Sequence, residues 1–305
     1  MLFRSTGKLE DEAAKRIDFV GMGAGIEFRA EHLAQFREFG AGRGLQPGHQ
    51  IRAPQRPLSL SDLSVAQLAA RVAHLGAEPF RTTQILDGAW RSVASSWSGV
   101  TTLGRELQER LASEIRFSAF DDVERQEAED GATTKLLLTL SDGAKVEAVL
   151  MRSPADPRRG SGPRATICVS SQAGCAVGCP FCATGELGFA RNLSAGEIQD
   201  QVRVARQILR AEGRELTNVV YMGMGEPLQN LDAVLASIDG LVDPKRGGIG
   251  QRRITVSTSG VVPGIERLAR ERPQLNLAVS LHAARNPLRD LLVPNRKSTR
   301  LNSSH

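Results

Sequence analysis

Apolar residues at helical spacing mark a small helical unit in the first half of the chain. Ser64 followed by Gln67 forms a capping box, a pair of polar residues that satisfies backbone N–H groups at the start of a helix. Two apolar series with steps of three or four residues follow: Leu68, Val72 and Leu75, stopped by Gly76, and then Leu103, Leu107, Leu111 and Ile115. We expect Trp90 and Trp97 to fill the core of this unit rather than bind a ligand. The pattern predicts a helical accessory domain over residues 58–118.

Two β-prone runs separated by a turn come next. LLLTL and KVEAVL flank the residues S-D-G at 141–143, which favour a tight turn. Alternation in KVEAVL puts Glu147 on the face opposite its two neighbours. We therefore predict a β-hairpin in a linker region over residues 119–160.

Beyond residue 160, short apolar runs alternate with amphipathic helical stretches. Four runs are typical of strands, and each ends in a polar or glycine-rich loop: ATICVS, NVVYMGMG, RRITVSTSG and NLAVSLH. The first intervening helix begins at a capping box of Ser194 and Glu197, and the next follows Asn230. Parallel strands with helical crossovers are typical of a β/α barrel or a doubly wound sheet, with chemistry at the C-terminal strand ends. The predicted fold class is α/β, and residues 161–294 form its parallel-stranded part.

The two ends of the chain lack these patterns. Residues 1–57 have no sustained apolar period and are rich in Gly, Pro, Arg and Gln near their end, which is typical of a linker or a disordered arm. Residues 295–305 also lack an apolar period and are interpreted as a non-native tail.

Composition narrows the class of protein. With 305 residues, 41% hydrophobic and 24% charged, the chain is neither a disulfide mini-protein nor wholly disordered. No run approaches the roughly 18 apolar residues of a membrane span, and no secretion signal is recognisable, so we expect a cytoplasmic protein without a membrane partner. The formal net charge of +5 favours a polyanionic partner such as RNA only mildly, because codon bias explains an excess of arginine equally well.

Clustered cysteines carry the strongest chemical signal. All four lie close together in the sequence: Cys168, Cys175, Cys179 and Cys182. A disulfide framework would spread cysteines along the chain, and cytosolic thiols stay reduced. The last three form C-x3-C-x2-C directly after the first parallel strand. Zinc sites usually pair two cysteine knuckles or add histidine, but the five histidines are far away in sequence, so a [4Fe–4S] cluster with one open iron fits better than a structural zinc ion.

This loop resembles that of the radical S-adenosylmethionine (radical SAM) superfamily. Four stretches in order narrow the resemblance: SSQAGCAVGCPFCATGELGFARNLSAGEI, YMGMGEPLQN, RRITVSTSGVVPGI and LAVSLHAARNPLRDLLVP. From about residue 58 to about residue 295 the chain resembles the RlmN-type methyltransferases, which act on carbon 2 of adenosine in large-subunit ribosomal RNA and in tRNA. The resemblance implies a partial radical SAM β/α barrel, a [4Fe–4S] cluster and S-adenosyl-L-methionine as cofactors, ribosomal RNA and tRNA as substrates, and an external electron donor.

The resemblance also implies roles for individual residues. Cys175, Cys179 and Cys182 would hold the cluster. Gly225 and Glu226 match the family's cofactor-binding pair, and a carboxylate beside a glycine can neutralise an ammonium at close backbone approach, although GMGEP alone is equally typical of a tight turn. Further cofactor contacts are matched by residues at the ends of the third and fourth strands: Ser257, Ser280, Leu281 and His282. A lone strand-end histidine is more often structural, so His282 depends mainly on the resemblance.

Two more residues are implicated in catalysis by the same resemblance. Glu147 matches a glutamate that is proposed to take a proton from the substrate, and the alternative is a solvated strand face. Cys168 matches a thiol that releases the methylated RNA by forming a disulfide with a second, methyl-carrying cysteine, and the alternative is a small buried hydrophobe. In the family that second cysteine lies near the C-terminus, but this chain has none beyond Cys182. We therefore expect a truncated, inactive fragment of a carbon-2 methyltransferase whose last strand, NLAVSLH, promotes aggregation.

Two other functions stay open on the sequence. One is the sibling type of enzyme that methylates carbon 8 of adenosine, which these motifs do not separate from the carbon-2 type. The other is a non-catalytic RNA-binding module in which the cysteines hold zinc.

Overall fold

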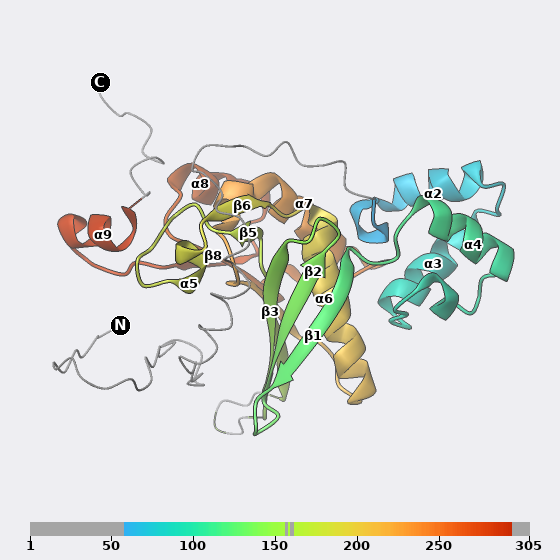
Figure 1. Ribbon diagram of the computed structural model, residues 1–305, viewed down its shortest axis with the longest axis horizontal. Helices are drawn as coiled ribbons and strands as arrows, with labels where there is room; N and C mark the ends of the chain where they lie inside the picture. The colour runs from blue at the N-terminus through green and yellow to red at the C-terminus, as the bar shows by residue number, and fades with distance from the viewer. Residues whose placement is uncertain (1–57, 156–157, 159–161, 295–305) are drawn as a thin grey trace.

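A computed structural model describes residues 58–155, 158 and 162–294 (Figure 1). The predicted N-terminal arm, 1–57, and the predicted tail, 295–305, lie outside the described residues. None of the helices in the described part combines the length and the apolar character that crossing a membrane requires.

The N-terminal helices follow the predicted pattern closely. They comprise η1 (Leu60–Asp62), α2 (Val65–His74), α3 (Phe80–Trp90), η2 (Trp97–Gly99) and α4 (Arg105–Glu114). The Ser64–Gln67 capping box is present, and Trp90 and Trp97 are buried, as predicted. One boundary differs: Leu103 and Ile115 lie just outside α4, although both side chains are buried. The apolar spacing from Leu103 to Ile115 therefore marks residues that pack into the core both within α4 and just beyond its two ends.

A seven-stranded mixed sheet occupies the centre of the molecule, in the order β1-β2-β3-β4-β7-β8-β9. Its strands are β1 (Phe120–Glu127), β2 (Thr133–Leu140), β3 (Lys145–Ser153), β4 (Arg164–Cys168), β7 (Asn218–Tyr221), β8 (Ile254–Thr258) and β9 (Asn276–Val279). Pairs from β1 to β4 are antiparallel, and pairs from β4 to β9 are parallel. The predicted hairpin (β2–β3) and the four predicted parallel strands are confirmed, and β1 is an additional strand. The α/β fold class is therefore confirmed, with a sheet that does not close on itself within the described residues.

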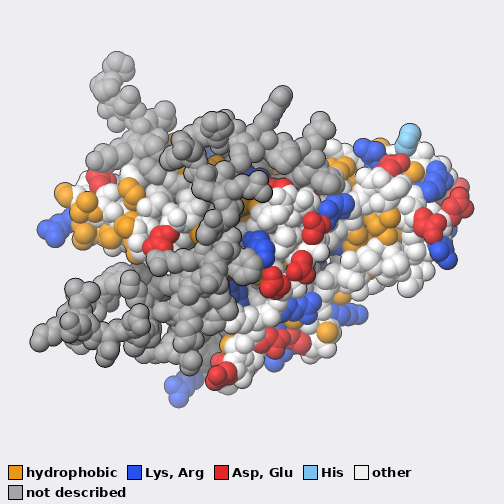
Figure 2. Space-filling view, viewed as in Figure 1, with side chains coloured by type: hydrophobic (Ala, Val, Ile, Leu, Met, Phe, Trp, Pro, Cys, Tyr) orange, Lys and Arg blue, Asp and Glu red, His pale blue; other side chains and the backbone are white. Residues whose placement is uncertain are grey.

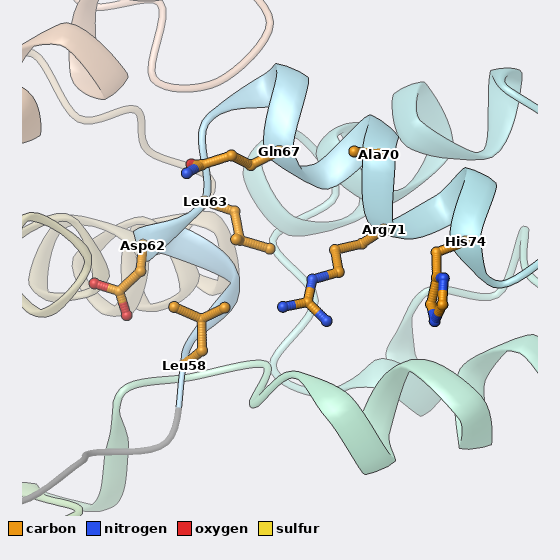
Figure 3. A pocket seen from close by; sticks show the side chains of 7 residues that line it. All are labelled: Leu58, Asp62, Leu63, Gln67, Ala70, Arg71 and His74. Carbon is orange, nitrogen blue, oxygen red and sulfur yellow. The ribbon is translucent and has the colours of Figure 1, made fainter.

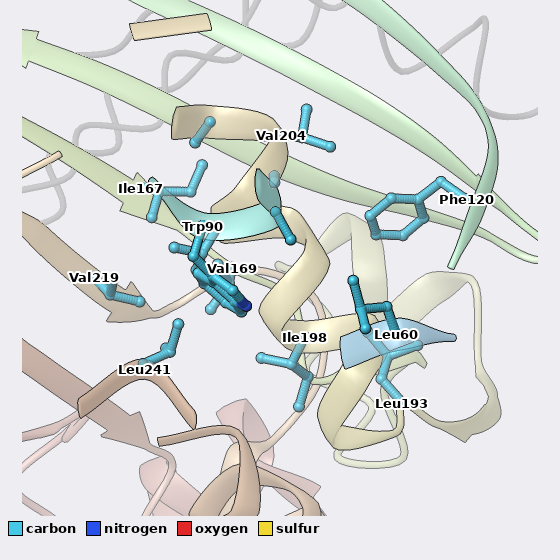
Figure 4. Packing of buried hydrophobic residues seen from close by; sticks show 14 of the residues in the cluster. Leu60, Trp90, Phe120, Ile167, Val169, Leu193, Ile198, Val204, Val219 and Leu241 are labelled. Carbon is cyan, nitrogen blue, oxygen red and sulfur yellow. The ribbon is translucent and has the colours of Figure 1, made fainter. Parts of the chain in front are cut away.

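Helices cover one face of the parallel strands. They are α6 (Ala195–Ala211), α7 (Leu231–Val242) and α8 (Val262–Glu271), and α9 (Asn286–Leu292) follows β9. The predicted Ser194–Glu197 capping box starts α6. Figure 4 shows Ile198 of α6 and Leu241 of α7 in one cluster with Ile167 and Val219 of the sheet, and with Trp90 of α3. The N-terminal helices and the sheet thus share a core, while the domain boundaries drawn from the sequence stay a prediction.

Buried polar contacts also join α6 to the N-terminal helical segment. Arg203 of α6 donates through Nη1 to the Phe117 carbonyl oxygen (2.8 Å) and to Asp200 Oδ1 (2.7 Å). Asp200 Oδ2 in turn accepts the backbone N–H of Ala119 at 2.7 Å. These contacts pair the two buried charges and fix the helical segment on α6.

Strand register separates the two faces of the parallel sheet. Ile167, Val219 and Ile254 are neighbours across β4, β7 and β8, and all are buried on the helix-covered face. The next register row places Cys168 of β4, Val220 of β7 and Thr255 of β8 on the opposite face. This opposite face and the C-terminal ends of its strands carry the candidate site.

Candidate active site

The three predicted cluster ligands lie on one tight loop after β4. A small hairpin, β5 (Gln172–Gly174) and β6 (Phe189–Asn192), brackets this loop, and the short helix α5 (Ala183–Glu186) lies within it. The backbone N–H of Cys175 donates to the Gly188 carbonyl oxygen (2.8 Å), and that of Cys182 donates to the Cys179 carbonyl oxygen (3.0 Å). All four cysteines are free and half-buried. The loop therefore has a defined shape without a disulfide.

The thiols on this loop influence each other's ionisation. Burial raises the pKa of the Cys179 thiol to about 11, and the charges of Cys182 and Cys175 add to the rise. Burial, with further contributions from Cys182 and Glu226, also raises the pKa of Cys175. Several thiolates so close together need a nearby positive charge to be stable. A bound metal centre would supply that charge.

The donor set fits a cluster better than a single ion. Among the residues that the structure describes, no three His, Cys, Asp or Glu side chains are arranged to hold one metal ion. A tetrahedral zinc ion requires its ligands to meet at one centre. Each thiolate ligand of a [4Fe–4S] cluster binds a separate iron, so three neighbouring thiols on one loop suit that group.

Glu226 lies beside the cysteine loop at the C-terminal end of β7. Its side chain is buried, and its charge contributes to the raised pKa of both Cys175 and Cys179. Oε1 accepts the N–H of Leu228 (3.1 Å), and Oε2 accepts the N–H of Ser259 (2.7 Å). The carboxylate is therefore held in a fixed position next to the thiols.

Gly225 is required by the backbone that presents Glu226. Its φ is +99°, a conformation that L-residues with a side chain rarely adopt. A Cβ at this position would lie 2.5 Å from Cβ of Gln172. The turn interpretation of GMGEP is correct for the backbone, and the same turn brings a carboxylate to the cysteine loop.

Gln172 and Asn230 are polar residues of this site that the sequence analysis missed. Gln172 is buried; its Oε1 accepts the N–H of Glu226 (2.8 Å), and its Nε2 donates to Asn192 Oδ1 (2.8 Å). Asn230 Nδ2 donates to the carbonyl oxygens of Ser171 and Leu193, both at 2.8 Å. The sequence offers one signal for Gln172: it is a polar residue between an apolar strand and the cysteine motif, a position that suggests a role in the site.

The ends of β8 and β9 bring together the other predicted cofactor contacts. The hydroxyl oxygens of Ser257 and Ser280 are 3.5 Å apart. The His282 ring lies 4.9 Å from the ring of Phe181, which belongs to the cysteine loop. Leu281, between Ser280 and His282, is exposed. The structure therefore places these strand ends beside the loop that carries the thiols.

Glu147 and Cys168 occupy the same face of the sheet. Val149 of β3 is the register neighbour of Cys168 of β4, so their side chains point to the same face. Glu147 lies two residues before Val149 on β3 and therefore shares that face. The Glu147 side chain is 22% exposed, and Nζ of Lys135 lies 2.5 Å from its Oε1. This carboxylate is therefore partly shielded and ion-paired. Burial raises the pKa of the Cys168 thiol to about 12, opposed in part by a hydrogen bond from the Met222 backbone.

A separate groove lies in the N-terminal helical segment. It has a volume of about 490 Å³ and is lined by Leu58, Asp62, Leu63, Gln67, Ala70, Arg71 and His74 (Figure 3). None of the candidate site residues lines it, so it is not part of the cysteine site.

Comparison with known proteins assigns the part of the chain that carries this site to a protein superfamily. The sequence profile of the Radical SAM superfamily matches residues 169–302, which include the cysteine loop and the parallel strands after it. An α/β sheet with C-x3-C-x2-C after its first parallel strand therefore defines, together with this match, a radical SAM protein.

Several relatives narrow the class to a family. "Dual-specificity RNA methyltransferase RlmN" of Syntrophobacter fumaroxidans is 44% identical and matches over 78% of this chain and 66% of its own length. "Probable dual-specificity RNA methyltransferase RlmN" of Thermobifida fusca is 44% identical over 79% of this chain and 67% of its own length. The solved structure of a radical SAM methyltransferase from Sphaerobacter thermophilus has a TM-score of 0.74 and 45% identity, covering 79% of this chain and 69% of that one. The chain belongs to the RlmN family of radical SAM RNA methyltransferases. It spans 66% of the length of the first of these relatives.

Proposed function

We propose that this chain is the cluster- and cofactor-binding part of an enzyme that methylates carbon 2 of an adenosine in 23S ribosomal RNA and in tRNA. The observation that carries the proposal is the three-thiol loop beside the buried Glu226 at the C-terminal edge of parallel strands. The RNA substrates are supported by the names of the relatives, which describe dual-specificity RNA methyltransferases. An external electron donor and a cytoplasmic setting belong to the same proposal.

The cysteine loop would hold the cluster. Cys175, Cys179 and Cys182 would each ligate one iron of a [4Fe–4S] cluster and leave the fourth iron for the amino and carboxylate groups of S-adenosylmethionine. When bound and reduced, these cofactors supply a deoxyadenosyl radical, the reactive species that methylation of an unactivated aromatic carbon requires.

Residues at the strand ends would bind the cofactor. Glu226, fixed by two backbone N–H groups, would accept a hydrogen bond from the amino group of S-adenosylmethionine, and Gly225 would allow the backbone to approach closely. Further contacts would come from the ends of β8 and β9: Ser257, Ser280, Leu281 and His282.

Glu147 and Cys168 would act on the substrate. Glu147 would take a proton from the adenosine intermediate, and Lys135 would orient its carboxylate through the 2.5 Å ion pair. Cys168 would form the disulfide that releases the methylated RNA. Its high pKa keeps it as a thiol at neutral pH, so it becomes a nucleophile only when a base removes its proton. The second thiol of that disulfide is not among the four cysteines of this chain.

Anaerobic reconstitution with iron and sulfide tests the cluster. We expect a brown protein with absorbance near 400 nm and about four irons per chain. Cys179→Ala should lose the colour and most of the iron, whereas the matched variant Cys168→Ala should keep both. A colourless protein that contains zinc, or a Cys179→Ala variant that keeps a full cluster, would contradict the proposal.

The position of methylation needs a separate measurement. Mass spectrometry of nucleosides from RNA incubated with the intact enzyme, S-adenosylmethionine and a reductant should show 2-methyladenosine. Finding 8-methyladenosine instead would identify the sibling reaction.

A further inference from the structure

We propose that Arg289 of α9 is a positioning residue that fastens together the loops following β8 and β9, and so holds the strand ends that bind the cofactor. This inference rests on the proposed function, because that function assigns Ser257, Ser280, Leu281 and His282 to S-adenosylmethionine. Arg289 itself would touch neither the cofactor nor the substrate.

The guanidinium group of Arg289 bonds to both loops at once. Its Nη2 donates to the Ser259 carbonyl oxygen at 2.6 Å, and its Nε donates to the Leu281 carbonyl oxygen at 3.0 Å. Strand pairing between β8 and β9 reaches Thr258 and Val279, and the N–H of Ser280 donates to the Thr258 carbonyl oxygen (2.8 Å). Arg289 therefore connects the two loops beyond the point where the pairing of β8 and β9 ends.

Gly260 makes room for this contact. Its φ is +109°, and a Cβ there would lie 2.8 Å from Nη2 of Arg289. A residue with a side chain at this position would therefore be strained and would also push the guanidinium away. The loop after β8 is shaped to accept an arginine.

Both loops that Arg289 holds lead directly to site residues. Ser259 accepts from Arg289 through its carbonyl while its N–H donates to Glu226 Oε2 (2.7 Å). The Leu281 carbonyl directly precedes His282, whose φ of +58° is unusual for a residue with a side chain. Releasing Arg289 should therefore loosen one of the two donors that fix Glu226 and the backbone that holds His282.

A planar guanidinium is needed for this geometry. Nε and Nη2 are rigidly spaced donors that reach two carbonyl oxygens at the same time. The ammonium of lysine is a single centre on a flexible stem, so it can replace one of these bonds more readily than both. Arg289→Lys should accordingly restore only part of the function lost in Arg289→Ala.

The experiment compares four variants with the unsubstituted chain: Arg289→Ala, Arg289→Lys, Gly260→Ala and the control Arg285→Ala. Arg285 is exposed at the start of the same helix, and its side chain makes no capping hydrogen bond, so its loss removes the same charge without the two contacts. Amide hydrogen exchange of residues 258–261 and 279–283 reports on the loops without any cofactor. Equilibrium binding of S-adenosylmethionine to the reconstituted protein reports on the site.

We expect faster exchange of both segments and about tenfold weaker S-adenosylmethionine binding in Arg289→Ala, the loss that one hydrogen bond to a charged group accounts for. Gly260→Ala should change exchange and affinity in the same direction, and Arg289→Lys should change them less. Arg285→Ala should change neither, and the iron content should be the same in all four variants. Unchanged exchange and affinity in Arg289→Ala, or an equal loss in Arg285→Ala, would overturn the inference. Failure of the unsubstituted reconstituted chain to bind S-adenosylmethionine would instead contradict the proposed function, and is recognisable before any substitution is made.

Discussion

At the scale of single residues, the site depends on backbone conformations that place a few polar groups. Gly225 is the clearest case, because its φ of +99° aims the following Glu226 at the cysteine loop. Gln172 of β5 then accepts the N–H of Glu226 and packs against the glycine, so the backbone that carries the carboxylate is held by a strand residue.

We expect Gly225→Ala to destabilise the chain by about 2 kcal/mol or more, since the new methyl group meets Gln172 and the backbone is strained. Chemical denaturation measures this change. Gly250→Ala is the matched control, because a Cβ there meets nothing within 4 Å. Equal stability of the two variants would show that the close approach to Gln172 is not maintained in solution.

At the scale of elements, one arginine links the β2–β3 turn to the start of α6. Arg191 of β6 donates through Nε to Asp142 Oδ2 (2.6 Å) and through both terminal nitrogens to Glu197 (2.9 Å each). Glu197 is also the capping-box residue of α6. Three side chains thus join the β2–β3 hairpin, the β5–β6 hairpin that brackets the cysteine loop, and α6.

This link predicts a pH dependence of stability. Burial alone would raise the pKa of Asp142, but the hydrogen bond from Arg191, the backbone hydrogen bond from Ala144 and the charge of Arg191 together bring the pKa below the ordinary 3.8. The contribution, about 1 kcal/mol for such a partly exposed pair, is therefore present above pH 3.8 and lost as the pH falls through the lowered pKa. Unfolding free energies measured from pH 6 downward should show this loss in the unsubstituted chain and not in Asp142→Asn. The control Asp122→Asn, at an exposed position on β1, should have the same pH profile as the unsubstituted chain. If Asp142→Asn also has that profile, the link is contradicted.

The elements that the sequence predicted are those with local signals. Capping boxes at Ser64 and Ser194 and the apolar periods behind them predicted α2 and α6, and cysteine spacing predicted the loop of the candidate site. β1 could not be predicted, because its sequence FDDVERQE has no alternation and most of its residues are exposed. Its pairing with β2 is a tertiary contact. Ser259 and Arg289 were missed for the same reason, because the Ser259 backbone N–H and the Arg289 guanidinium both bond to segments that only the tertiary fold brings near.

At the scale of the whole molecule, several apolar side chains near the C-terminal end of the described chain are exposed. Figure 2 shows hydrophobic side chains gathered over α9, where Leu288 and Leu291 are exposed, while basic and acidic side chains are interspersed elsewhere on that face. β9 is the last strand in the sheet order, so its outer edge has no neighbouring strand among the described residues.

From the exposed apolar side chains on β9, the last strand in the sheet order, we predict that this chain self-associates. Leu277 and Val279 are register neighbours of Val256 and Thr258, which are buried on β8, yet they are 42% and 50% exposed. An apolar strand with free backbone donors and acceptors is a template for pairing with another copy, and a charged side chain on the edge opposes it. We expect concentration-dependent association in sedimentation or light scattering, and a marked reduction in Val279→Lys. Val262→Lys is the control, because Val262 is equally exposed (57%) but lies on α8 rather than on the strand edge. A chain that stays monomeric at high concentration, or an equal gain in Val262→Lys, would show that the β9 edge does not drive association.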